Sequence, residues 1–111
     1  MSELNDLLEN EPLLADYPCQ FRVLSLNNGV AELASPRSAS MPAIKFLAII
    51  YPDLKDKSPQ NPILIEAQKE LADRQAFAKK LILQQADVSS VNWTLDRDWY
   101  AKYDIYLASY R

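Results

Sequence analysis

Residues 61–86 read NPILIEAQKELADRQAFAKKLILQQA, and this stretch determines the fold that we predict. Asn61 is a good helix-capping residue and Pro62 suits a first helical turn, so we predict a long helix over residues 62–86. At 100° per residue, most of its apolar side chains fall on one side and form a core-facing stripe. That stripe comprises Ile63, Leu64, Ala67, Leu71, Ala78, Leu81 and Ile82.

A second, thinner apolar line follows the opposite side of the same helix. It consists of Ile65, Ala72, Ala76 and Leu83, spaced seven, four and seven residues apart. A helix with two apolar faces is either sandwiched within its own fold or half covered, with a partner supplying the rest of the cover. In a domain of this size we expect the sandwich, and a partner-binding face is the alternative.

A β-hairpin precedes this helix in the sequence. The chain's only glycine stands in the pair Asn28–Gly29, between two segments rich in apolar residues. A type I′ turn needs positive φ at both central residues, which Asn-Gly tolerates, so we predict a hairpin over residues 20–34. An isolated hairpin is only marginally stable. It must therefore pack on helices or recruit a third strand, and its open edge is a candidate for β-augmentation by a partner.

Two further helices are predicted before the long one. Residues 3–16 form an acidic amphipathic helix that Pro12 breaks or kinks. Residues 42–51 are apolar on all sides, which favours a buried central helix capped by Ser40 or Met41, with a buried strand as the alternative. Residues 52–62 contain three prolines and form an exposed loop.

The last element predicted is an aromatic helix over residues 95–109, after a connector at residues 87–93. Thr94 is its expected cap, and Leu95, Trp99, Tyr103, Tyr106, Leu107 and Tyr110 share one broad face. Such a face requires cover from the core or from another protein, and a strand over residues 105–110 is the alternative. The elements together predict a single α+β domain over residues 1–111, mostly helical, with one hairpin packed on helices.

Composition excludes most chemistry that a small protein performs. The 111 residues include no histidine, one cysteine and one glycine. Histidine is the usual general base and the commonest metal ligand, and glycine-rich turns hold phosphates. We therefore expect neither an enzyme nor a bound metal or other cofactor.

The remaining candidate groups each favour a structural role. Glu66, Glu70 and Asp73 share a helical face, but a carboxylate-bridged metal site draws histidines from other helices as well. Asp96 and Asp98 would point about 200° apart on a helix, which suits capping better than paired acid–base work. Cys19 lacks a histidine to activate it and is expected to be a small core residue.

Charge and hydropathy indicate the environment. The net charge is −3, and five acidic residues precede the first basic one, Arg22. This acidic N-terminal segment is either a solvated helix or a docking element for a basic partner. The longest apolar run, residues 46–51, is far short of the ~20 residues that span a bilayer, so we expect no membrane insertion and a cytoplasmic location.

These exclusions leave interaction as the predicted function. We expect a protein partner or a homo-oligomer, bound through Ile65, Ala72, Ala76 and Leu83 and through the aromatic residues Trp99, Tyr103, Tyr106 and Tyr110. Nucleic acid is an improbable partner for an acidic chain. A nucleic-acid-associated regulator is nevertheless the alternative function, and its basic residues would be Arg74, Lys79, Lys80, Arg97 and Lys102.

Overall fold

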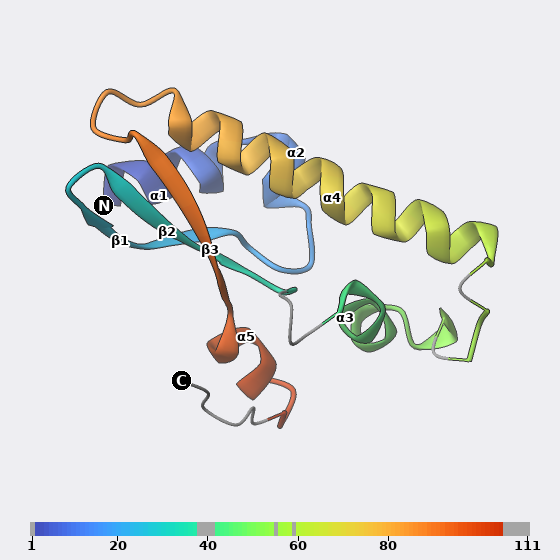
Figure 1. Ribbon diagram of the computed structural model, residues 1–111. Helices are drawn as coiled ribbons and strands as arrows, with labels where there is room; N and C mark the ends of the chain where they lie inside the picture. The colour runs from blue at the N-terminus through green and yellow to red at the C-terminus, as the bar shows by residue number, and fades with distance from the viewer. Residues whose placement is uncertain (1, 38–41, 55, 59, 106–111) are drawn as a thin grey trace.

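The computed structural model describes residues 2–37, 42–54, 56–58 and 60–105. The helices are α1 (Ser2–Asn10), α2 (Pro12–Ala15), α3 (Ala43–Ile50), α4 (Pro62–Leu83) and α5 (Arg97–Ala101), with a 3₁₀ turn η1 (Pro52–Leu54). The strands are β1 (Arg22–Asn27), β2 (Val30–Ser35) and β3 (Ser90–Leu95). The α+β class is therefore correct, but the sheet has three strands where a single hairpin was expected (Figure 1).

The hairpin forms around the Asn-Gly pair. Asn28 and Gly29 have φ values of 52° and 83°, the left-handed values that a two-residue turn of this kind requires. β1 and β2 pair antiparallel from Asn27↔Val30 outward, and the register shifts between Val23 and Ser25 at a bulge. β2 is the central strand of the sheet.

The segment predicted as a connector is the third strand. β3 pairs parallel with β2, from Val30↔Ser90 to Ser35↔Leu95. The N–H groups of Ser89 and Ser90 both donate to the carbonyl of Gly29, at 2.7 and 3.1 Å. The hairpin turn thus fixes where β3 begins, although the whole of α3 and α4 lies between the two strands in the sequence.

Helix α4 begins as predicted, because the Asn61 side chain accepts a hydrogen bond from the N–H of Ile63 at 2.9 Å. It ends at Leu83, three residues before the predicted end. Five residues of the predicted stripe are buried: Leu64, Ala67, Leu71, Ala78 and Ile82. Ile63 is an exception with 65% exposure, because this first turn extends beyond the sheet, as Figure 1 shows.

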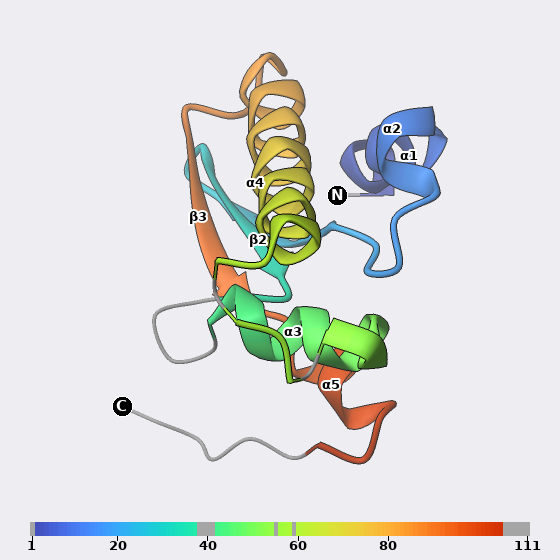
Figure 2. The same ribbon diagram turned by 90° about the vertical axis from the view of Figure 1, so that its right-hand side faces the viewer.

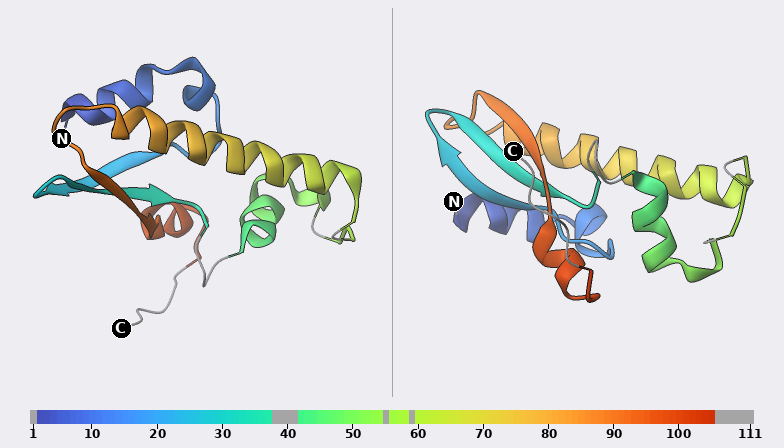
Figure 3. Two further views of the ribbon diagram at one scale, coloured as in Figure 1. Left: turned by 45° about the horizontal axis from the view of Figure 1, so that its top comes forward. Right: turned by 60° about the horizontal axis from the view of Figure 1, so that its bottom comes forward.

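The sheet has one covered face and one open face. α1 packs on β1 and α4, α2 packs on α4, and α4 packs on β3. Figure 2 shows α4 with the sheet on one side and α1–α2 on the other. Figure 3 shows the opposite face of the sheet, over which α5 alone of the described helices lies, at the end of β3.

The predicted helix over residues 3–16 is two helices, since Pro12 starts α2 after a break at Glu11.

Residues 43–50 are helical, so the strand alternative is wrong, but the helix is not central. α3 lies at one end of the molecule beside the first half of α4 (Figure 1). Phe46 and Leu47 are its fully buried residues, whereas Ile44 is 41% exposed. The predicted caps Ser40 and Met41 lie outside the described residues.

The C-terminal helix is much shorter than predicted. Leu95 ends β3, and the side chain of Asp96, not Thr94, caps α5 by accepting from the N–H of Trp99 at 3.0 Å. α5 ends at Ala101, and Asp104 has a φ of 61°, which no helix continues through. Residues 106–111 lie outside the described part of the chain, so the rest of the predicted helix and most of the alternative strand do too.

Candidate functional site

The second apolar line of α4 is solvent exposed, so the predicted sandwich is wrong. Ile65 is 52% and Leu83 37% exposed, and Ala72 and Ala76 between them are exposed as well. We call these four residues the α4 apolar face. The fold leaves it open because the sheet and the α1–α2 pair contact α4 on other sides of the helix (Figure 2).

Two side chains show in which direction this face points. The guanidinium of Arg74 lies over the ring of Tyr17, 5.1 Å from its centre, on the α2 side. The amide of Gln75 donates to the hydroxyl of Ser35, at 2.6 Å, at the end of β2. Successive side chains are rotated by 100° about the helix axis. The rotation that leads from Arg74 to Gln75 therefore brings Ala76 still farther from the α2 side. The α4 apolar face therefore looks out on the β3 side of the molecule.

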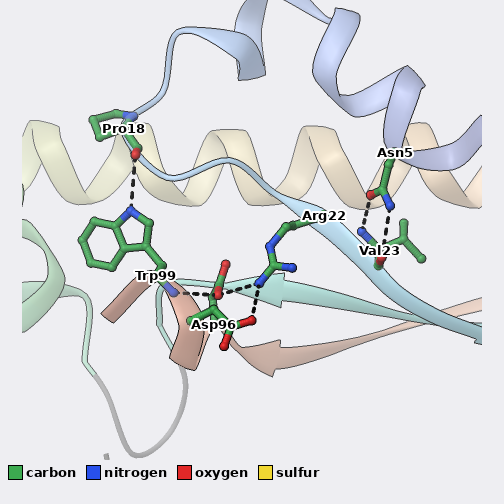
Figure 4. Close-up of polar contacts among 7 residues, drawn as sticks. Asn5, Pro18, Arg22, Val23, Asp96 and Trp99 are labelled. Atoms are coloured by element: carbon green, nitrogen blue, oxygen red, sulfur yellow. Dashed lines mark hydrogen bonds and ion pairs between the residues drawn. The ribbon is translucent and has the colours of Figure 1, made fainter. Parts of the chain in front are cut away.

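The C-terminal aromatic residues divide between core and surface. Trp99 is only 6% exposed, its ring centre lies 4.9 Å from that of Phe46, and its indole N–H donates to the carbonyl of Pro18 at 3.4 Å (Figure 4). Trp99 is therefore a core residue and not the partner-binding residue that we predicted. Tyr103 is 49% exposed, and its ring is tilted against that of Trp99, with the ring centres 4.7 Å apart. Tyr106 and Tyr110 lie outside the described residues.

The outer edge of the hairpin, predicted to accept a strand, is occupied at one position. The Asn5 side chain of α1 accepts from the N–H of Val23 at 2.6 Å and donates to its carbonyl at 3.2 Å (Figure 4). A partner strand would need both of these backbone groups. The other edge of the sheet is β3, which the sequence did not reveal.

An ion cluster joins β1 to the start of α5. Arg22 contacts Asp96 at 2.9 Å and Asp98 at 3.6 Å, and Asp96 is buried. Hydrogen bonding to Asp96 raises the pKa of Arg22 above its usual value. The two carboxylates therefore share one cation, an arrangement that sequence reasoning missed because Arg22 is 74 residues from Asp96. Since Asp96 also caps α5, the cluster fastens the helix to the sheet.

A groove of about 880 Å³ lies between the segment that follows α3, which includes η1, and the first half of α4. Tyr51, Leu54 and Ile63 supply apolar surface, and Asp53, Glu66 and Glu70 supply acidic groups. Ile63, exposed on the first turn of α4, is therefore part of the wall of this groove. Within the described ranges, no three side chains of the metal-ligating types are grouped to hold a metal ion.

The basic residues of the alternative function do not meet on one surface. Lys79 and Lys80 are exposed on α4, whereas Arg97 and Lys102 are exposed on and after α5. The sheet separates the two helices (Figure 3). The exposed aromatic surface that base stacking needs is also reduced, because Trp93 is half-buried with its ring centre 5.9 Å from that of Phe21.

Cys19 is fully buried. Burial, with a smaller contribution from the nearby Asp96 carboxylate, raises the pKa of its thiol to about 12. The thiol is therefore protonated at neutral pH, and it is a poor nucleophile because the thiolate is the reactive form.

Among the helices that the structure describes, none combines the length and the apolar content needed to cross a bilayer. Comparison of the chain with protein-family models, with curated proteins and with solved structures found no match.

Proposed function

We propose that this protein is a non-enzymatic interaction module, such as an adaptor, assembly factor, small subunit or inhibitor, that docks on another protein through the α4 apolar face. The observation that supports the proposal is the exposure of Ile65, Ala72, Ala76 and Leu83 along one helix that the fold leaves uncovered. Aliphatic residues gathered on an accessible face gain free energy when a partner removes them from water.

The shape of this face suits a partner that approaches closely. The two large side chains stand at its ends and the two alanines lie between them, so another backbone element fits over the middle. Charged groups border it, including the ion pair of Lys69 and Asp73 at 3.5 Å. An apolar centre with a charged rim is the usual composition of a protein interface.

Tyr103 is a second anchor in this proposal. Its ring is half exposed yet held against Trp99, so little conformational entropy is lost when a partner covers it. Tyrosine is among the residues enriched at binding hot spots. A cytoplasmic location is part of the same proposal.

The test compares two doubly substituted variants with the tagged wild type. Ile65→Asp with Leu83→Asp places two carboxylates on the α4 apolar face. Gln68→Asp on the helix with Gln84→Asp at its C-cap adds the same charge away from that face. Each is used to capture partners from the native cells, with nuclease and in moderate salt, followed by mass spectrometry. We expect one stoichiometric protein that the wild type and the control retain and the first variant loses.

Three results would count against the docking proposal. Equal recovery with both variants would show that the partner binds elsewhere. Loss of the cooperative melt in the first variant would show that Ile65 and Leu83 belong to the core. Recovery that vanishes with nuclease and falls steeply with salt would favour the nucleic-acid alternative, because phosphate contacts are strongly salt dependent.

A further inference from the structure

The two edges of the sheet are protected very differently. β1 carries Arg22, has a bulge between Val23 and Ser25, and has the Asn5 side chain bound to Val23. Charges, bulges and covering groups are the devices by which natural proteins prevent edge strands from pairing. β3 reads SVNWTL, with neither charge nor proline, and its register with β2 is unbroken over all six residues.

Every second residue of β3 directs its backbone hydrogen-bonding groups away from β2. The N–H of Ser90 and the N–H of Asp96 point toward the β2 side, where they donate to Gly29 and Ser35. Backbone groups of successive residues in a strand point to opposite sides, so those of Val91, Trp93 and Leu95 point outward. These three backbones have no hydrogen-bond partner among the residues that the structure describes.

The side chains of β3 make the strand complementary to itself. Val91, Trp93 and Leu95 are half-buried on the face that α4 covers, whereas Ser90, Asn92 and Thr94 lie on the open face, where Asn92 and Thr94 donate to Glu32 at 3.1 and 2.6 Å. An antiparallel copy centred on Trp93 sets Val91 opposite Leu95 and Asn92 opposite Thr94. Apolar groups then face apolar groups, polar groups face polar groups, and no charges oppose each other.

We infer that the partner at this side of the molecule is a second copy of the same chain, joined by antiparallel pairing of the two β3 strands into one continuous sheet. The inference rests on the proposed docking function and names its partner. The twofold axis beside Trp93 makes each outward-facing residue exchange two hydrogen bonds with its opposite number. The second half of α4, which packs over the sheet beside β3, adds Ala76 and Leu83 to the same contact surface.

The pairing predicts the effect of charges at two positions. Asn92→Lys with Thr94→Lys sets lysines opposite each other across the axis, and like charges directly opposite are destabilising. Asn92→Glu with Thr94→Lys sets opposite charges in the same two places. Ser25→Lys with Asn27→Lys adds the same positive charge as the first variant on the protected strand β1, and is the matched control.

The experiment is sedimentation equilibrium of the full chain at low ionic strength, where surface charges are little screened. We expect a dimer of the 12.7 kDa chain for the wild type, the control and the charge-swapped variant. The two-lysine variant is expected to have a dissociation constant raised at least about tenfold. Hydrogen exchange at Val91, Trp93 and Leu95 is expected to slow as the protein concentration rises.

Two results would overturn the inference. A wild type that stays monomeric at all concentrations would exclude a second copy, and capture through the α4 apolar face would still decide the docking function. A dimer that is indifferent to charge at positions 92 and 94 would exclude pairing through β3. If Ile65→Asp with Leu83→Asp then dissociates it, the docking function stands without the strand pairing.

Discussion

The side chain of Asn5 occupies both backbone hydrogen-bonding groups of Val23, one helix residue standing in for a neighbouring strand. Its amide accepts from the N–H at 2.6 Å and donates to the carbonyl at 3.2 Å. A peptide group offers the same donor and acceptor, so this asparagine blocks the edge of β1 at Val23 and also fixes α1 against the sheet.

Asn5→Ala is expected to lower the free energy of unfolding by about 1–2 kcal/mol, because two partly buried backbone groups lose their partner. Urea denaturation measures this change, and hydrogen exchange at the Val23 amide should become faster. Asn5→Asp retains the acceptor for that amide and loses the donor, so it should fall between the wild type and Asn5→Ala. Unaltered stability and exchange in Asn5→Ala would show that water replaces the amide at no cost.

Gly29→Ala is expected to destabilise the protein by about 1–3 kcal/mol. The φ of Gly29 is +83°, and an added Cβ would lie 2.6 Å from the hydroxyl oxygen of Ser89. The matched change Asn28→Gly, at a φ of 52°, keeps the turn geometry and should cost much less. Thermal melts of the two variants test this, and equal melting temperatures would contradict the close approach of β3 to the turn.

Leu71→Ala is expected to destabilise by about 2–5 kcal/mol, since Leu71 is fully buried on the core stripe of α4. The corresponding change on the exposed side, Ile65→Ala, should cost far less because the side chain is already half in water. Chemical denaturation of both variants measures the difference. Similar losses at the two positions would mean that the phase of the helix is wrong.

The pH dependence of stability should reveal Cys19. Its pKa is raised by burial from the ordinary value of 9.0 to about 12, so the protonated thiol stabilises the fold fully below pH 9. That contribution declines as the pH rises from about 9 toward the folded value, because the unfolded thiol ionises first. Burial also raises the pKa of Tyr17 and Tyr100, so denaturation is best compared between pH 8 and about 10.

Between pH 8 and about 10, the free energy of unfolding of Cys19→Ala should fall by less than that of the wild type. The native thiol should also resist a thiol reagent such as dithionitrobenzoate until denaturant is added. Rapid reaction of the folded protein would contradict the burial of Cys19.

Elements with local signals were predictable from the sequence. Asn61 and Pro62 mark the start of α4, and Asn28–Gly29 marks the turn, because each acts through its own backbone preferences. The core stripe of α4 was also predictable, apart from Ile63. The exposure of the second apolar line was not, since periodicity reveals two faces but not which elements will cover them.

Elements that depend on distant partners were missed. Val91, Trp93 and Leu95 alternate with polar residues, and this alternation is a strand signal. The signal covers only six residues, however, and Thr94 could equally cap a helix. Pairing with β2 makes the segment a strand, and the sequence of the segment does not reveal that pairing. Trp99 was misassigned for the same reason, since an aromatic stripe does not distinguish a core residue from a binding residue.

The carbonyl of Gly29 accepts from the hydroxyl of Ser89, which lies 60 positions later in the chain. On the ribosome, the hairpin and α1 emerge well before β3, the strand that completes their sheet. The backbone groups of β2 that face β3 therefore lack their partners while α3 and α4 are synthesised. Closing so long a loop has an entropic cost that only the later contacts repay. We therefore expect the rate of folding to be set by the arrival of β3, and the nascent chain to be most open to misassembly just before residue 95 leaves the exit tunnel.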